Sequence, residues 1–190
     1  MASYSAPLRD MRFVYHELFD SSDISALPGF EEATPDLIDA VLEEAAKVCE
    51  NQLFPINRGG DEEGCRYHQG GEVTTPSGFR ECYRAYAEAG WIGLSSDPQY
   101  GGQGLPPAIS TLLEEMVCSS NIAFGTYVGL SRGAYRAIAA FGNDTLKTRY
   151  LPKLTSGEWS GTMCLTESQC GTDLGLLRTR AEPHADGSYR

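Results

Sequence analysis

Apolar residues recur at helical spacing through most of the first 156 residues, and this repetition restricts the chain to a mainly α fold. The start signals agree with the spacing, since residues 34–36 (TPD) combine a capping hydroxyl, a first-turn proline and an early acid. Strand character appears only from Trp159 onward. The predicted helices cover residues 7–19, 35–54, 76–89, 106–119, 122–141 and 143–154.

The composition allows a sizeable core, because 41% of the 190 residues are hydrophobic, and the length suits one domain and the beginning of another. A formal net charge of −11 disfavours binding to nucleic acids and anionic lipids, since such a surface repels phosphate groups. No apolar run approaches the roughly 20 residues of a membrane-spanning helix. We therefore expect a soluble, cytoplasmic protein that binds neither nucleic acid nor membrane.

The six cysteines indicate neither a disulfide framework nor a zinc site, because no two of them form a CxxC pair. Cys65 and His68 are three residues apart in the glycine-rich stretch 57–75, but two ligands without further partners rarely hold a metal. We expect no metal site, and we interpret residues 57–75 as a surface loop.

Three glycines recur every four residues within the helix predicted at 122–141. Gly125, Gly129 and Gly133 share one face, although each costs about 1 kcal/mol relative to alanine inside a helix. Two explanations stay open at this point: close packing against a neighbouring helix, or room for the chain of a ligand.

Residues 163–175 (MCLTESQCGTDLG) break the helical pattern with a short β-like run that leads into a polar turn. Thr166 and Thr172 offer hydroxyl groups there, and Gly171 allows a ligand to approach the backbone. Such a turn suits a flat, polar, phosphate-bearing cofactor. It equally suits an ordinary turn at the end of a strand, because a single glycine-containing turn is a weak signal.

A series of short motifs occurs in an order that resembles the acyl-CoA dehydrogenase family. The motifs are GWIGL at 90–94, YGGQG at 100–104, GND at 142–144, RYLP at 149–152, GE at 157–158 and LTE at 165–167. The resemblance covers roughly residues 35–182, and its most specific part is 163–175, which looks like the flavin-contacting signature of that family. The leader at 6–11 (APLRDM) and the ending at 170–177 (CGTDLGLL) look similar to the 3-(methylthio)propanoyl-CoA dehydrogenase branch.

The resemblance implies an N-terminal extension with a short docking helix at 1–33, a helical domain at 34–157, and the first strands of an incomplete middle β-domain at 158–190. It also implies FAD as cofactor and α,β-desaturation of an acyl-CoA thioester, in which a carboxylate removes the α-proton and the β-hydride passes to the flavin. An electron-transfer flavoprotein would accept the electrons, and the full-length enzyme would be a homo-oligomer.

The same resemblance assigns roles to individual residues. Those that would contact the cofactor are Met163, Cys164, Leu165, Thr166, Gly171 and Thr172. Met163 and Leu165 would lie against the isoalloxazine ring, and Thr166 would hydrogen-bond near its N5 and O4 edge. Thr172 would also face the thioester-bearing arm of the substrate.

Gly125 and Gly129 would border the acyl chain. In medium-chain relatives a glutamate stands about where Gly129 is, so the resemblance implies a wider or deeper pocket here. On that hypothesis the substitution Gly129→Leu shortens the preferred acyl chain.

Several positions depart from the family pattern. Ser168 replaces the usual proline, and Cys170 and Leu176 stand where smaller residues are common. We interpret Glu167 as a structural carboxylate of the turn rather than as an acid or base. Cys164 and Cys170 are interpreted as packing cysteines, because no cation lies near them in the sequence to activate a thiolate.

No catalytic residue is assigned within this chain, because the resemblance places the catalytic carboxylate and the C-terminal helices beyond Arg190. We therefore expect an N-terminal fragment that is inactive alone. Two alternatives stay open: an acyl-CoA oxidase of the same fold, which passes electrons to oxygen, and a helical interaction module without catalysis.

Overall fold

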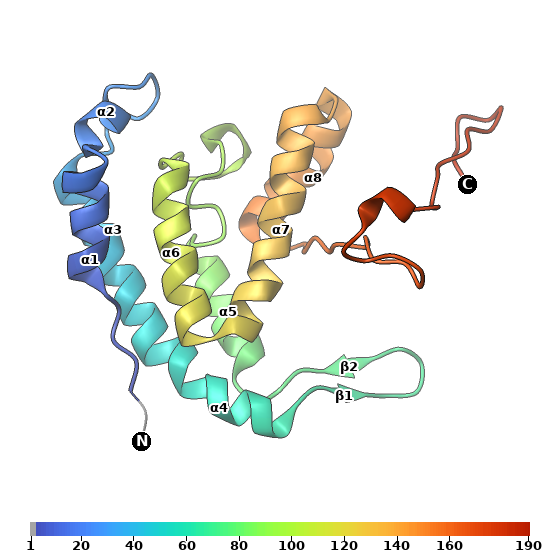
Figure 1. The fold of residues 1–190 in the computed structure, drawn as a ribbon, viewed down its shortest axis with the longest axis horizontal. Helices are drawn as coiled ribbons and strands as arrows, with labels where there is room; N and C mark the ends of the chain where they lie inside the picture. The colour runs from blue at the N-terminus through green and yellow to red at the C-terminus, as the bar shows by residue number, and fades with distance from the viewer. Residues whose placement is uncertain (1–2) are drawn as a thin grey trace.

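The structure is a computed structural model that describes residues 3–190. In it α3 packs on α6, α6 on α7 and α7 on α8 (Figure 1). The predicted mainly α fold is confirmed. The helices are α1 (Leu8–Arg12), α2 (Ser21–Ser25), α3 (Pro35–Val48), α4 (Phe54–Glu63), α5 (Phe79–Glu88), α6 (Pro107–Ser120), α7 (Ile122–Phe141) and α8 (Asp144–Ser156). Two π-helical turns, η1 (Phe13–Leu18) and η2 (Cys49–Leu53), two 3₁₀ turns, η3 (Pro98–Tyr100) and η4 (Leu174–Leu176), and strands β1 (Arg66–Tyr67) and β2 (Val73–Thr74) complete the order.

Helix α3 begins where the sequence predicts it. Thr34 Oγ1 accepts a hydrogen bond from the N–H of Leu37 at 3.4 Å. Pro35 occupies the first turn, where its missing N–H would have no helical partner. The buried side of α3 carries Ile38 and Leu42, four residues apart, and so faces the core.

The predicted end of this helix before Pro55 is wrong. After α3 the chain widens into the π-helical turn η2 and continues as α4. Pro55 lies in the first turn of α4, where a proline removes no required hydrogen bond. The predicted loop at 57–75 is therefore helical up to Glu63, and its remainder forms a β1–β2 hairpin in which Arg66 pairs with Thr74 (Figure 1).

The N-terminal segment docks on α3, as its short length requires. Met11 and Tyr15 are buried there, each with only 3% of its surface exposed. Arg12 forms ion pairs with Asp39 and Glu43 of α3, at 3.1 and 2.5 Å. Apolar burial is the main source of this docking, because partly exposed ion pairs contribute little.

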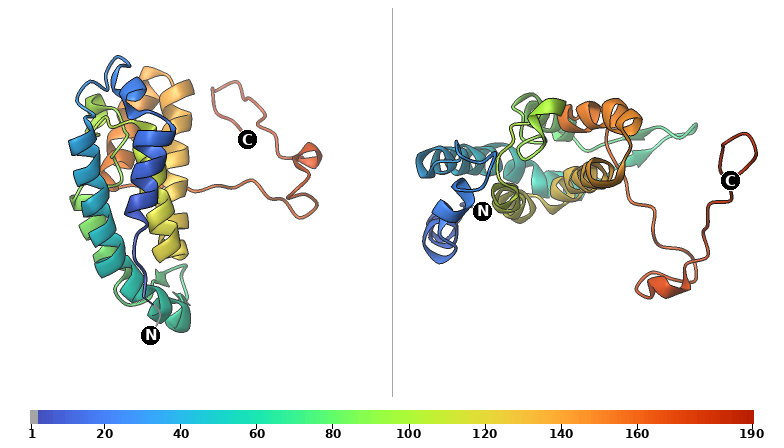
Figure 2. Two further views of the ribbon diagram at one scale, coloured as in Figure 1. Left: turned by 60° about the vertical axis from the view of Figure 1, so that its left-hand side comes forward. Right: turned by 90° about the horizontal axis from the view of Figure 1, so that it is seen from above.

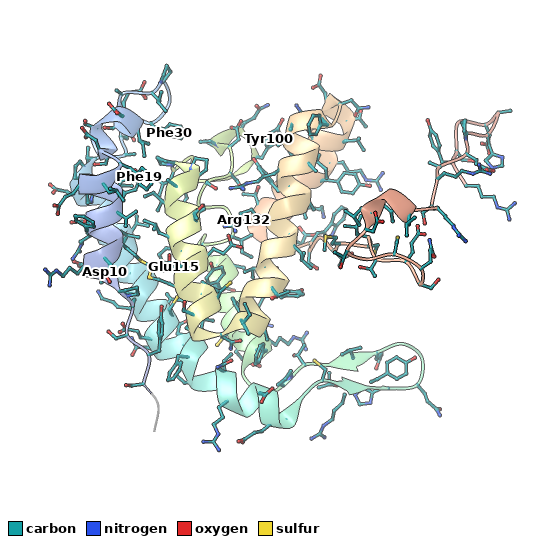
Figure 3. All side chains as sticks on the ribbon, in the orientation of Figure 1. Asp10, Phe19, Phe30, Tyr100, Glu115 and Arg132 are labelled. Carbon is teal, nitrogen blue, oxygen red and sulfur yellow. The ribbon has the colours of Figure 1, made fainter. Side chains whose placement is uncertain are left out.

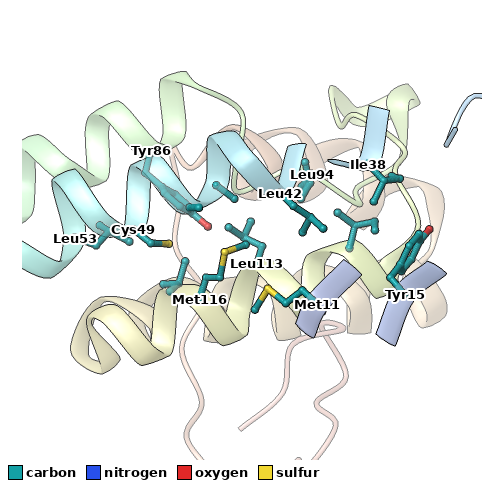
Figure 4. Packing of buried hydrophobic residues seen from close by; sticks show 14 of the residues in the cluster. Met11, Tyr15, Ile38, Leu42, Cys49, Leu53, Tyr86, Leu94, Leu113 and Met116 are labelled. Carbon is teal, nitrogen blue, oxygen red and sulfur yellow. The ribbon is translucent and has the colours of Figure 1, made fainter. Parts of the chain in front are cut away.

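The core lies between α3, α5 and α6 (Figure 4). Tyr86 of α5 stacks edge-on against Phe124 of α7, with ring centroids 5.3 Å apart, and so connects these two helices. The most deeply buried large side chains are Phe124, Ile38, Leu42, Leu53, Leu94, Ile109, Met116, Leu151 and Val117.

Two glycine-containing turns, at 90–94 and 100–104, bond to each other. Gln103 N–H donates to the carbonyl of Gly93 at 3.0 Å, and Leu105 N–H donates to the carbonyl of Leu94 at 3.0 Å. The Asp97 N–H donates to the Tyr135 hydroxyl of α7 at 2.9 Å. These bonds attach the connection between α5 and α6 to itself and to α7.

A single residue, Asn121, joins α6 to α7. Its Oδ1 accepts the N–H of Phe124 at 3.1 Å and so caps α7, while its Nδ2 donates to the carbonyl of Leu53 at 3.2 Å. Asn121 is 1% exposed, so both bonds form away from water, where an unpaired polar group is costly. The α6–α7 connection is thereby attached to the end of η2.

The glycine face of α7 lies against α6 for part of its length. A Cβ built on Gly125 would lie 2.6 Å from Cys118 Sγ and 3.3 Å from Cys118 Cα. A Cβ on Gly129 would lie 3.3 Å from Glu114 Oε1, whereas a Cβ on Gly133 would meet nothing within 4 Å. Close packing therefore accounts for Gly125, and the three glycines have different surroundings.

This difference gives a stability test. Gly125→Ala should destabilise the chain by about 1–2 kcal/mol, because an overpacking cost of roughly 1–3 kcal/mol exceeds the gain in helix propensity. Gly133→Ala serves as the matched control and should stabilise it by up to about 1 kcal/mol. Urea unfolding of both variants measures this, and equal stabilisation by the two substitutions would contradict the packing explanation.

Residues after α8 run away from the helices (Figure 2). Where the sequence predicts strands, residues 158–190 contain two isolated β-bridges, Glu167 with Cys170 and Pro183 with Tyr189. A strand needs a neighbour for its backbone groups, and within residues 3–190 these short turns pair only with themselves. In that same range no helix is long and apolar enough to cross a lipid bilayer.

Candidate functional site

A small cavity lies among α5, α6 and α7, on the glycine face of α7. Its volume is about 30 Å³, which is the share of one water molecule in the liquid. The walls are mostly apolar and aromatic. The lining residues are Tyr86, Trp91, Ile92, Ser110, Leu113, Glu114, Val117, Gly125, Val128, Gly129 and Arg132. Both glycines predicted to border an acyl chain are therefore part of one cavity.

The cavity contains an ion pair between Arg132 of α7 and Glu114 of α6 (Arg132 is labelled in Figure 3). Arg132 Nη1 also donates to the carbonyl of Ser110 at 3.2 Å. Tyr86 contributes a phenol whose pKa is raised by burial, so it is neutral at physiological pH. Although 42% of the Glu114 side chain is exposed, its carboxylate pairs with Arg132 and lies beside the space that the missing side chain of Gly129 leaves.

The segment predicted to contact a cofactor leaves the helical body at Gly161. Gly161 N–H donates to Ser131 Oγ of α7 at 3.1 Å, and Tyr127 donates to Ser160 Oγ at 3.4 Å. A Cβ on Gly161 would lie 2.5 Å from the Cβ of Ala134, so only glycine fits here without a shift. Helix α7 thus lines the cavity with Gly129 and Arg132 and holds the departing segment through the adjacent Ser131.

Most of the predicted cofactor residues on this segment are exposed. Met163, Cys164, Leu165, Thr166, Gly171 and Thr172 all have free surface, with Met163 at 65%. In the described chain, residues 162–166 make no backbone–backbone hydrogen bond through their N–H groups. The Thr166 side chain lies over Gly171, where a Cβ would be 3.3 Å from its methyl carbon.

The structure therefore brings the predicted residues together in two groups. Gly125 and Gly129 line the cavity, and the six residues of 163–172 lie on the segment beyond Gly161. Sequence reasoning missed Arg132 and Ser131, which face these two groups from α7. Arg132 has a sequence signal only in its position beside the glycine face, whereas Ser131 lies on nearly the opposite side of α7 and has none.

The two cysteines near the segment differ in burial. Cys170 is buried and Cys164 is exposed. Among residues 3–190, no cluster of three or more histidine, cysteine or acidic side chains could hold a metal ion.

Glu167 closes the turn that follows the exposed segment. Its N–H donates to the carbonyl of Cys170 at 2.9 Å, and its carboxylate accepts the N–H groups of Thr179 at 2.8 Å and Arg178 at 3.1 Å. The side-chain amide of Gln169 donates to the same carboxylate. The Thr179 hydroxyl and these donors together lower the pKa of Glu167 to about 2, so it is a structural carboxylate and a poor proton donor.

The low pKa predicts how acid affects this turn. Because the folded pKa lies below the unfolded value of 4.5, the carboxylate stabilises the turn at neutral pH, and that contribution fades as the pH falls toward about 2. Amide proton NMR shifts of Arg178 and Thr179 should therefore titrate with a midpoint near pH 2, and Glu167→Gln should abolish this titration. A midpoint at the ordinary value of 4.5 would contradict the assignment.

Comparison with known proteins shows the family to which the chain belongs. Residues 36–158 match the model of the acyl-CoA dehydrogenase N-terminal domain. The chain belongs to the acyl-CoA dehydrogenase family. The match lies within the range 35–182 predicted from the motifs, and it confirms that resemblance.

Two curated relatives align over nearly all of this chain. 3-Methylmercaptopropionyl-CoA dehydrogenase of Ruegeria pomeroyi is 38% identical over 187 residues, which are 98% of this chain and 32% of that protein. Butyryl-CoA dehydrogenase of Syntrophomonas wolfei is 32% identical over 184 residues, which are 95% of this chain and 30% of that protein. The first similarity confirms the predicted likeness to that branch, and the chain spans about a third of the length of both relatives.

Solved structures agree in fold. Glutaryl-CoA dehydrogenase from Mycobacterium smegmatis superposes with a TM-score of 0.67 and 24% identity, covering 85% of this chain and 39% of that one. Butyryl-CoA dehydrogenase from Megasphaera elsdenii superposes with a TM-score of 0.64 and 23% identity, covering 81% of this chain and 38% of that one. At 23% and 24% sequence identity, the likeness shows a shared fold, that is, the same arrangement of helices.

Proposed function

We propose that this chain forms the N-terminal part of a flavin-dependent acyl-CoA dehydrogenase that introduces an α,β double bond into an acyl-CoA thioester. The observation that carries the proposal is the double role of α7. This helix lines a cavity with Gly125 and Gly129, and its Ser131 accepts the N–H of Gly161, just before residues 163–175, which we call the signature segment. Membership of the family supports the reaction class. We divide the chain into an extension at 1–33, a helical domain at 34–157 and the start of a β-domain at 158–190.

The signature segment has the properties that one edge of FAD requires. Its N–H groups at 162–166 have no backbone partner in the described chain, its apolar side chains Met163 and Leu165 are exposed, and Thr166 is exposed as well. Cys164, Gly171 and Thr172 complete the proposed contact surface, and Thr172 also faces the thioester-bearing arm. When bound, FAD supplies the acceptor for the β-hydride of the substrate. No residue of this chain is proposed as the catalytic base.

The acyl group is proposed to enter the cavity among α5, α6 and α7. Its walls, including Leu113, Val117 and Val128, are apolar, and because its volume of about 30 Å³ holds one water molecule, it would have to widen on binding to admit even a short acyl group. The relatives named above act on short acyl-CoA thioesters, as 3-methylmercaptopropionyl-CoA dehydrogenase and butyryl-CoA dehydrogenase, and we propose a substrate of the same class.

The proposed electron acceptor is an electron-transfer flavoprotein, and the proposed full-length enzyme is a cytoplasmic homo-oligomer. An acyl-CoA oxidase is the second candidate, because it shares the fold and differs in passing electrons to oxygen. Peroxide formation under air in place of reduction of a flavoprotein acceptor would favour the oxidase.

The test uses the FAD-loaded enzyme that contains this domain. Its flavin absorbance should bleach on addition of butanoyl-CoA without oxygen, because the flavin is reduced in the reaction. Thr166→Val should weaken FAD retention about tenfold, which corresponds to roughly 1.4 kcal/mol for one lost hydrogen bond. Thr145→Val, at an exposed position of α8, is the matched control and should leave retention unchanged.

A flavin that binds but does not bleach with any acyl-CoA would contradict the reaction. Equal FAD retention in the Thr166 and Thr145 variants would contradict the proposed cofactor edge alone.

A further inference from the structure

We propose that the glycine-containing turns at 90–94 and 100–104 form, with α5 and the end of α8, a binding site for a small molecule that carries a phosphate group. A hollow of about 590 Å³ lies there, and its lining includes three glycines of the two turns, Gly90, Gly93 and Gly101. Its size falls in the range of roughly 300–1,000 Å³ that small-molecule sites occupy. The hollow shares no lining residue with the cavity among α5, α6 and α7, and the proposed function uses neither turn.

Glycine backbone forms part of the wall of this hollow. Gly90 and Gly101 have φ angles of 80° and 87°, in the left-handed region that favours glycine. A Cβ on Gly101 would meet nothing within 4 Å, so its backbone borders open space. At the end of α8, Gly157 accepts the Tyr83 hydroxyl through its carbonyl at 2.9 Å, which attaches α8 to α5 beside the hollow. A ligand can therefore approach the backbone closely here.

Several polar side chains of the lining are already paired within the chain. Gln103 Nε2 donates to the carbonyl of Gly90 at 3.0 Å. Ser156 Oγ donates to the carbonyl of Lys153 at 3.3 Å. Glu158 forms an ion pair with Lys153 Nζ at 2.6 Å, which offsets its negative charge. Recognition of a ligand is thus left to the side chains that have no such partner.

Two arginines of the lining belong to this unpaired group. Arg80 and Arg84 stand one turn apart on α5, both are exposed, and neither joins an ion pair among residues 3–190. In that part of the chain Glu88 is the one acid of the lining without an ion pair, so the unpaired side chains carry one positive charge in excess. Because the whole chain has a net charge of −11, this local excess marks the hollow as a place for an anion.

Thr155 adds a buried hydroxyl to the same lining. Only 5% of the residue is exposed, and within residues 3–190 its Oγ1 has no hydrogen-bond partner. A buried hydroxyl is costly until it is paired. An oxygen of a bound ligand would accept the hydrogen bond and remove this cost.

A phosphate group fits these donors better than a carboxylate does. A phosphate monoester has three terminal oxygens and a charge of about −1.5 to −2 at pH 7, whereas a carboxylate has two oxygens and one charge. Guanidinium groups bind phosphate oxygens through charge-assisted hydrogen bonds, often in pairs. Arg80 and Arg84 would bind two of the oxygens and Thr155 the third. The ring of Tyr83 and the methyl group of Ala87 line the space left for the organic part of the ligand.

The test measures calorimetric Kd values of phenyl phosphate and benzoate for the FAD-loaded enzyme that contains this domain. The two probes share a phenyl ring and differ in the anionic group. Arg80→Gln with Arg84→Gln removes the two unpaired guanidinium groups from the hollow. Arg136→Gln with Arg149→Gln is the matched control, because it removes two exposed arginines of α7 and α8 that lie outside the lining.

The native enzyme and the control should bind phenyl phosphate with the same Kd, and more tightly than benzoate. In the double variant of α5 the Kd of phenyl phosphate should rise about tenfold or more, because charge-assisted hydrogen bonds are lost. Absence of binding by the native enzyme, an unchanged Kd in this variant, or tighter binding of benzoate would overturn the proposed site.

A second variant covers the case in which loss of both arginines disturbs the fold. Thr155→Val keeps the shape of the side chain and removes a hydroxyl that has no partner in the described chain, so the Tm should not fall. The Kd of phenyl phosphate should rise about threefold or more. Thr145→Val, at an exposed position of α8, is the control and should change neither value. An unchanged Kd in Thr155→Val, or a lower Tm, would contradict the role of the hydroxyl and overturn the site.

Discussion

The buried amide of Asn121 is the interaction on which the arrangement of the helices depends. It turns the chain from α6 into α7 within one residue, caps α7 through Phe124, and binds the carbonyl of Leu53 at the end of η2. A connection this short holds the two helices close together, and Gly125 meets that demand by leaving room for Cys118. The close pairing of α6 with α7 then places Glu114 within reach of Arg132.

Helix α7 connects the parts of the candidate site. The cavity lies beside Gly129 and Arg132, while Ser131 receives the N–H of Gly161 at the start of the signature segment. The two attachments lie on nearly opposite sides of α7, since the cavity is lined by Gly125, Gly129 and Arg132 and Gly161 packs on Ser131 and Ala134. The site is thus organised by α7 rather than by the signature turn alone.

Much of the fold follows from the sequence, because apolar spacing and caps act locally. The helix predicted at 122–141 has those bounds in the structure, and α6 differs by one residue at each end. The end predicted before Pro55 was wrong, since the π-helical turn that carries the chain past it has no local signal. The pairing of Glu114 with Arg132 was not predicted for a related reason: Arg132 and the space at Gly129 belong to another helix. Long-range pairing of this kind is not encoded in periodicity.

On the proposed function, α7 carries the acyl-binding cavity on one side and the attachment of the flavin-contacting segment on the other. A crystal structure of the FAD-loaded enzyme that contains this domain, with a short acyl-CoA bound, tests it most directly. The end of the acyl group should lie among α5, α6 and α7 beside Gly129, and the isoalloxazine ring should lie against residues 163–166. An acyl group that runs outside this cavity, or a flavin that does not contact the segment after Gly161, would contradict it.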